Sequence, residues 1–123
     1  MKEALRAIPG KVVLFLDACH AGAFADKLYR ELTDPDCPVL MICSCGADET
    51  SGESRSLKAG LFTEAVIEGL SGQAAKDQDG AISADELFEY VRKRVKDLSE
   101  DQQHPICSRL GAKEARELLL AKP

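Results

Sequence analysis

Residues 11–22 read Lys-Val-Val-Leu-Phe-Leu-Asp-Ala-Cys-His-Ala-Gly, so an unbroken apolar run is followed, three residues after its end, by a cysteine. The apolar residues Val12 to Leu16 are typical of a parallel β-strand that is covered on both faces. Cys19 follows where the chain is expected to turn from this strand into a helix, which is where α/β proteins place functional groups. The helix dipole and a protonated His20 would both favour its thiolate form. The alternative interpretation is a buried structural cysteine.

The residues after this turn predict a strand-helix-strand unit. An apolar residue at every fourth position from Phe24 to Leu32 predicts a helix, which Asp34-Pro35-Asp36 would end. Val39 to Ile42 is again apolar throughout and predicts a second buried strand. This order of elements forms a right-handed crossover with functional loops at the carboxyl ends of the strands, so the sequence predicts the α/β class.

The second half of the chain is expected to be mainly helical. The apolar spacing from Phe62 to Leu70 predicts a helix that ends near Gly72. Ser83, with Glu86 three residues later, has the form of a capping box that opens another helix. The buried stripe of that helix is expected to be Leu87, Val91, Val95 and Leu98.

Three further segments complete the expected secondary structure. Met1 to Ile8 predicts the last turns of a helix that ends at Pro9-Gly10. Glu49 to Gly60 is polar and rich in Ser and Gly, as in a loop. Ala112 to Ala121 predicts a final amphipathic helix with Leu118 and Leu119 facing inward.

The composition is that of an ordinary soluble domain. A chain of 123 residues with 45% hydrophobic and 30% charged residues predicts one compact globular unit. The net charge of −5 and the lack of a basic stripe argue against nucleic-acid binding. No apolar stretch approaches the roughly 20 residues needed to cross a membrane, and no signal peptide begins the chain. Five cysteines without a regular framework favour a reducing compartment, so we expect a cytoplasmic protein.

The segment from Asp17 to Gly22 resembles the nucleophile motif of the metacaspase-like branch of the caspase superfamily, which usually reads Asp-x-Cys-His-Ser-Gly. Residues 38–52, 60–70 and 79–91 resemble later segments of the same domain. The resemblance implies a caspase-like three-layer α/β/α sandwich with a mostly parallel sheet that lacks its earlier strands. Residues 1–123 would then form a partial caspase-like peptidase domain.

The resemblance implies a cysteine endopeptidase that acts on polypeptides and requires no cofactor for its chemistry. The Cys19 thiolate would attack the scissile carbonyl, and water would hydrolyse the acyl-enzyme. In metacaspases the aspartate at the position of Asp17 lines the S1 pocket and favours Arg or Lys before the cleaved bond. A carboxylate can pair with a guanidinium through two charge-assisted hydrogen bonds. The alternative is that Asp17 only satisfies backbone donors at the end of a strand.

The histidine that should serve as general base is missing from the expected position. In the family it lies on an earlier strand, about 50 residues before the cysteine, but none of the residues before Cys19 is a histidine. His20 should diverge from its neighbour, and His104 is expected in a surface loop. We therefore expect a fragment, a truncated reading frame or half of a split enzyme, whose partner is the missing upstream half of the domain or a second chain. A catalytically silent caspase-like module that binds proteins is the alternative function.

Two sets of carboxylates raise the possibility of calcium binding. Asp26 matches a calcium ligand position of metacaspases through the resemblance. Asp77, Asp79 and Glu86 occupy the third, fifth and twelfth places of an EF-hand-like loop, whose first place is Ala75, a residue without an oxygen ligand. The alternative is a turn followed by a capped helix.

The remaining cysteines admit a zinc hypothesis. Cys43 and Cys45 alternate in a strand and share one face, and Cys107 with His104 would complete four ligands. No Cys-x-x-Cys pair is present, so buried thiols are the simpler interpretation.

Overall fold

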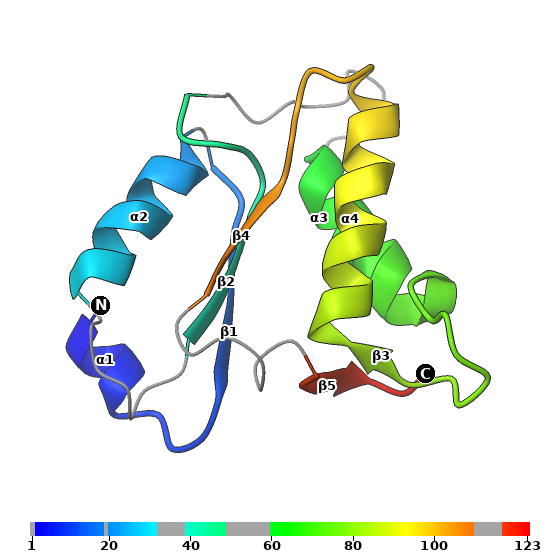
Figure 1. Cartoon of the computed structure of the whole chain (residues 1–123), viewed down its shortest axis with the longest axis horizontal. Coiled ribbons are helices and arrows are strands. Elements are labelled where there is room, and N and C mark those ends of the chain that lie inside the picture. Colours follow the sequence, from blue (N-terminus) through cyan, green and yellow to red (C-terminus); the bar gives the residue numbers. More distant parts are fainter. Residues whose placement is uncertain (1, 19, 32–38, 49–59, 110–116) are drawn as a thin grey trace.

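The computed structural model describes residues 2–18, 20–31, 39–48, 60–109 and 117–123. A sheet of strands β1 (Val12–Leu16), β2 (Val39–Cys43) and β4 (Ile106–Arg109) lies between two layers of helices (Figure 1). One layer consists of α1 (Lys2–Arg6) and α2 (Ala21–Glu31). The other contains α3 (Leu61–Glu68), the π-helical turn η1 (Gly69–Gln73) and α4 (Ala84–Leu98). The α/β class and the three-layer arrangement are therefore confirmed.

The three-stranded sheet is mixed. β1 pairs with β2 in parallel, from Val12 opposite Val39 to Leu16 opposite Cys43. The helix α2 connects them, which is the crossover that the sequence predicts. β4 was not predicted, and it runs antiparallel on the other side of β2, with Cys43 opposite Ile106. Its apolar part is short and ends in Ser and Arg, so its sequence pattern alone is weak.

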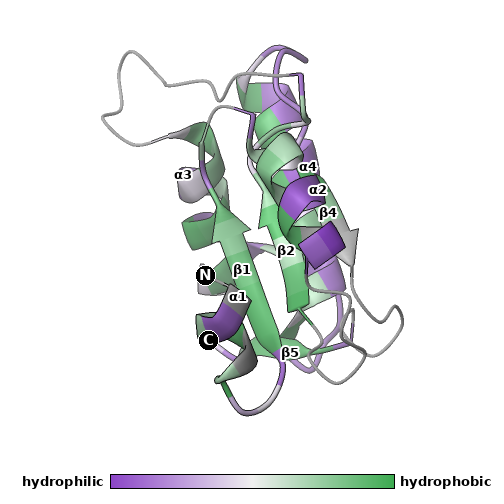
Figure 2. Cartoon of the chain, turned by 90° about the vertical axis from the view of Figure 1, so that its left-hand side faces the viewer, coloured by the Kyte–Doolittle hydropathy of each residue, from purple (hydrophilic) through white to green (hydrophobic). Residues whose placement is uncertain are grey.

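The central strand β2 explains why the predicted strands are apolar throughout. Successive side chains of a strand point to opposite faces, and both faces of β2 are covered by helices. All five residues of β2 are buried, and Figure 2 shows the apolar character of β1 and β2. Leu40 and Ile42 pack in the cluster that includes Phe62, Leu87, Val91 and Val95. Val39, Met41 and Cys43 pack in the cluster that includes Leu5, Ala21, Ala25 and Leu28.

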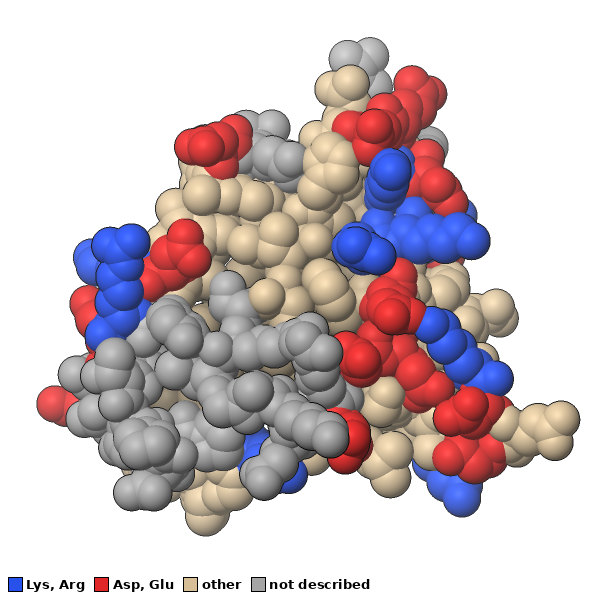
Figure 3. All heavy atoms as spheres, viewed as in Figure 1, with Lys and Arg blue, Asp and Glu red and all other residues tan. Residues whose placement is uncertain are grey.

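The helix α4 begins at the predicted capping box. Ser83 Oγ accepts from the Glu86 backbone N–H at 3.2 Å, and Glu86 Oε2 accepts from the Ser83 N–H at 2.8 Å. Three residues of the predicted stripe, Leu87, Val91 and Val95, are fully buried, whereas the fourth, Leu98, is half-buried. Charged side chains of both signs cover the solvent side of this layer (Figure 3). The helix is thus held at its first turn by the cap and along its length by one apolar face.

The prediction of a helix over Ala112–Ala121 is wrong at its end. Leu119–Ala121 forms the strand β5, which pairs antiparallel with β3 (Ile82–Ser83) in a second, two-stranded sheet. Leu119 is 67% exposed, whereas Leu118 packs against the core as predicted. Consecutive leucines fit a helix or a strand equally well, and pairing with β3 decides between them. The earlier part of the predicted helix, residues 110–116, lies outside the described residues, as does most of the predicted loop at 49–60.

Within the described ranges, no helix is both long enough and apolar enough to cross a membrane.

Candidate active site

The chain turns sharply between β1 and α2, in the stretch where the sequence predicts the nucleophile. Cys19 itself lies outside the described residues, whereas the residues on both sides of it are described. His20 has a left-handed backbone with φ 58°, and its carbonyl accepts from the Ala23 N–H at 3.0 Å. The Ala18 carbonyl accepts from the Ala21 N–H at 3.2 Å. These bonds close a tight strand-to-helix turn at residues 18–21, where the sequence places it.

Ser44, directly after β2, holds the residue that precedes Cys19. Its Oγ accepts from the Ala18 N–H at 3.3 Å and donates to the Ala18 carbonyl at 3.2 Å. The Cys45 thiol donates to the same carbonyl at 3.5 Å, and the Ser44 N–H donates to the Leu16 carbonyl at 2.8 Å. Ser44 and Cys45 are fully buried, whereas Ala18 is exposed, so these bonds tie an exposed turn to the core. The end of β2 therefore fixes the backbone at the start of the turn.

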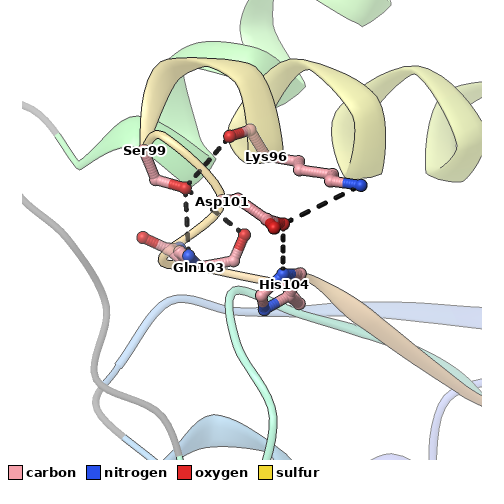
Figure 4. Close-up of polar contacts among 5 residues, drawn as sticks. All are labelled: Lys96, Ser99, Asp101, Gln103 and His104. Atoms are coloured by element: carbon pink, nitrogen blue, oxygen red, sulfur yellow. Dashed lines mark hydrogen bonds and ion pairs between the residues drawn. The ribbon is translucent and has the colours of Figure 1, made fainter.

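Gln103, in the segment that follows α4, binds the backbone of Ser44. Its side chain is 1% exposed, and its Nε2 donates to the Ser44 carbonyl at 2.7 Å. Its backbone N–H donates to Ser99 Oγ at 3.0 Å (Figure 4). Neither Ser44 nor Gln103 is indicated by the sequence, because a buried polar residue whose partner is distant in the chain leaves no periodic signal.

Gly22 lies where α2 approaches the segment after β2 most closely. A Cβ atom added to Gly22 would lie 2.7 Å from the Ala47 nitrogen and 2.8 Å from the Gly46 carbonyl carbon. His20 Nδ1 lies 3.0 Å from the Ala47 carbonyl oxygen, which can only accept, so this nitrogen carries the proton. The segment 44–47 thus contacts residues 16, 18, 20 and 22, on both sides of Cys19. The glycine of the motif is required for close packing.

Asp17 lies beside the first turn of α3. Its Oδ2 accepts from Thr63 Oγ1 at 2.7 Å, and no other bond of Asp17 is found in the described ranges. A Cβ atom added to Gly60, which precedes α3, would lie 2.8 Å from the same oxygen. The carboxylate is exposed, so among the described residues it does not serve the backbone donors of the alternative interpretation. The start of a helix also favours a negative charge.

The two histidines have other partners. His20 bonds the Ala47 carbonyl, as above, and His104 Nε2 lies 2.8 Å from Asp101 Oδ1 (Figure 4). Lys96 Nζ approaches the same carboxylate at 3.8 Å. The hydrogen bond from His104, and then the charge of Lys96, lower the pKa of Asp101. Neither contact assigns a general base for Cys19.

Asp77, Asp79 and Glu86 line one shallow pocket, but their oxygens are engaged in local hydrogen bonds or do not converge as a metal site. Asp79 Oδ1 accepts from the Ala81 N–H at 3.0 Å, and Glu86 belongs to the capping box. Asp77 lies in the same turn, whereas Asp26 lies on α2, in the helical layer across the sheet. The described part of the chain contains no group of three or more His, Cys, Asp or Glu side chains that could hold a metal ion. The local structure is the turn and capped helix of the alternative interpretation.

The described cysteines are free thiols in the core. Cys43 and Cys45 are buried, and Cys107 is half-buried. Burial, followed by the nearby thiols of Cys107 and Cys45, raises the pKa of Cys43 to about 12. A thiol with such a pKa stays protonated at neutral pH and is a poor metal ligand and nucleophile.

A family model described as the caspase domain matches residues 1–115 of the 123 residues. Searches of curated proteins and of solved structures returned no significant match.

Proposed function

Because this chain belongs to the caspase domain family, which is a family of cysteine peptidases, we propose that it is a cysteine endopeptidase with Cys19 as its nucleophile. In this proposal the thiolate attacks the carbonyl of a peptide bond after Arg or Lys, as in the metacaspase-like branch. The observation that supports it best is the turn between β1 and α2, which the segment 44–47 holds on both sides of Cys19.

A nucleophile is effective when its position is set before the substrate binds. The bonds from Ser44 to both polar groups of Ala18 supply that restraint at the residue before Cys19. The helix α2 begins two residues after Cys19, and the positive end of its dipole favours a thiolate there. The Ala21 and Ala23 N–H groups already donate to the Ala18 and His20 carbonyls, so in this proposal the oxyanion is stabilised by another backbone donor of the turn.

Asp17 supplies the proposed preference for a basic side chain. Only one of its oxygens is bonded among the described residues, and no cation pairs with it there. An Arg side chain that enters beside it would form charge-assisted hydrogen bonds with the carboxylate. Asp17 is exposed beside the first turn of α3, which leaves it accessible to a substrate.

We also propose that the general base comes from another segment that pairs with β1. In the described sheet β1 has β2 as its neighbour on one side and no strand on the other. An edge strand presents unpaired backbone groups to which a further strand can add. Phe15, in this strand, is 37% exposed, which an added strand or its helix would reduce. That segment, from the same polypeptide or a second chain, would carry the histidine.

The reactivity of Cys19 tests the proposal directly. The protein is treated with a limiting amount of a peptidyl chloromethyl ketone that carries Arg next to the reactive group, and the labelled cysteine is identified by mass spectrometry. We expect Cys19 to react at least tenfold faster than Cys107, the half-buried thiol, and Cys19→Ala to abolish the fast labelling. Cys107→Ala is the matched control and should leave it unchanged. Equal labelling of the two cysteines would refute the proposal.

The second candidate function is a catalytically silent caspase-like module that binds a protein partner. It is favoured by the histidine contacts, since both histidines of the chain are bonded elsewhere. The two functions differ in their response to a partner that supplies a β-strand. Such a partner should confer cleavage of an Arg-containing peptide on the peptidase, and should bind the silent module without any cleavage.

A further inference from the structure

The contact between Asp17 and α3 bears on how a substrate would be selected. Thr63 is the third residue of α3, and its hydroxyl donates to Asp17 Oδ2 at 2.7 Å. A hydrogen bond to an ionised acceptor is stronger and more directional than one between neutral groups. Thr63 is also rigid, because its side chain is branched at Cβ and its helix is anchored by the buried Phe62. The hydrogen bond from Thr63 therefore restrains the orientation of the carboxylate.

Gly60 keeps the space beside this carboxylate open. Its backbone has φ −63° and ψ 144°, which any residue adopts, so its conformation does not require glycine. The space does require it, since an added Cβ would lie 2.8 Å from Asp17 Oδ2 and push the carboxylate aside.

We propose that Thr63 and Gly60 are specificity-determining residues, which orient Asp17 for a substrate with arginine before the cleaved bond. This inference rests on the proposed function and deepens it. A guanidinium is a planar fork that needs one orientation of the carboxylate, whereas a lysine ammonium is a point charge that tolerates several. Loss of the Thr63 hydroxyl lets the carboxylate rotate, so arginine binding suffers more than lysine binding.

The test compares rates of inactivation by three peptidyl chloromethyl ketones that differ only in one residue. That residue is arginine, lysine or citrulline, which has the shape of arginine without its charge. The ratio of the arginine rate to the lysine rate is the readout, because a general change in Cys19 reactivity cancels in it. We expect Thr63→Val to lower this ratio roughly three- to tenfold, as the loss of one hydrogen bond predicts. Thr63→Ser should restore it, and Gly60→Ala should lower it.

Ser71→Ala is the matched control, because it also removes an exposed hydroxyl, one that bonds the Ile67 carbonyl instead of Asp17. It should leave the ratio unchanged. An unchanged ratio in Thr63→Val, in a protein where Asp17→Asn removes the preference for arginine over citrulline, overturns the inference and keeps the proposed function. Equal rates with arginine and citrulline in the unmodified protein overturn the proposed role of Asp17 and the inference with it. If Thr63→Val does not fold, Thr63→Ser and Gly60→Ala still test the inference. A lowered arginine-to-lysine ratio in Thr63→Ser overturns it, and so does an unchanged ratio in Gly60→Ala.

Discussion

Gly22→Ala is the substitution for which local and tertiary reasoning give opposite signs. Gly22 lies in the first turn of α2 and is buried. Alanine is a better helix former than glycine by about 1 kcal/mol, so the helix considered alone would gain stability. In the folded protein the new methyl group would lie 2.7 Å from the Ala47 nitrogen and 2.8 Å from the Gly46 carbonyl carbon. We therefore expect the substitution to destabilise the protein.

The magnitude follows from these distances. Non-bonded heavy atoms are at their optimum near 3.5 Å, so both backbone contacts must open by roughly 0.7 Å. Overpacking of this kind costs about 1–3 kcal/mol. The segment that must move is anchored through Ser44 and Gln103, which favours the upper half of that range. After the helix gain is subtracted, we expect the free energy of unfolding to fall by about 1–2 kcal/mol.

Urea denaturation followed by circular dichroism measures this change, with the alkylation rate of Cys19 as a second readout. A third contact of the added methyl group is Ile106 Cδ1 at 2.9 Å, a side-chain atom that can be removed. The double variant Gly22→Ala with Ile106→Val, compared with Ile106→Val alone, should retain most of the loss, because the backbone contacts persist. Unchanged or increased stability in Gly22→Ala would show that the packing argument is wrong. Full rescue by Ile106→Val would show that the side chain, not the backbone, is the obstacle.

Three further outcomes are expected from the same structure. Ser44→Ala should lower the free energy of unfolding by about 1–3 kcal/mol and slow the alkylation of Cys19, since it removes two hydrogen bonds to the Ala18 backbone, each worth about 0.5–1.5 kcal/mol; a loss below about 0.5 kcal/mol in urea denaturation contradicts this. Glu68→Gln should destabilise the folded protein at neutral pH, because the hydrogen bond from Arg94 lowers the pKa of Glu68 below its ordinary 4.5. The loss should be at most about 1 kcal/mol, since the Glu68–Arg94 pair is partly exposed. A lowered folded-state pKa contributes stability above pH 4.5 that is lost as the pH falls, so the two proteins should converge in acid, and a difference that persists there refutes the assignment. Cys43, with its pKa raised to about 12, should resist iodoacetamide at pH 8 in the folded protein and react on unfolding in urea, as read by mass spectrometry; rapid reaction of the folded protein would contradict its burial.

Local patterns were sufficient for the elements that carry their own signal. The strand at 39–43 is apolar at every position because helices cover both of its faces. The strand at 12–16 is also apolar throughout, but it lies at the edge of the described sheet and its residues are half-buried or exposed. The helix at 84–98 is predicted by the Ser83 cap and by an apolar residue at each turn. The motif around Cys19 indicated the caspase family, to which the match over residues 1–115 assigns the chain.

Contacts between distant residues settled the rest. The bond from Ala18 to Ser44 joins positions 26 apart, and that from Gln103 to Ser44 joins positions 59 apart. Neither pair shares a helix turn or a strand, so no periodicity marks them. The strand β4 and the final strand β5 likewise owe their conformation to partners elsewhere in the chain. Burial on both faces of a strand is visible in the composition of the strand itself. A hydrogen bond or a close backbone approach between distant residues depends instead on which surfaces pack together in the folded state.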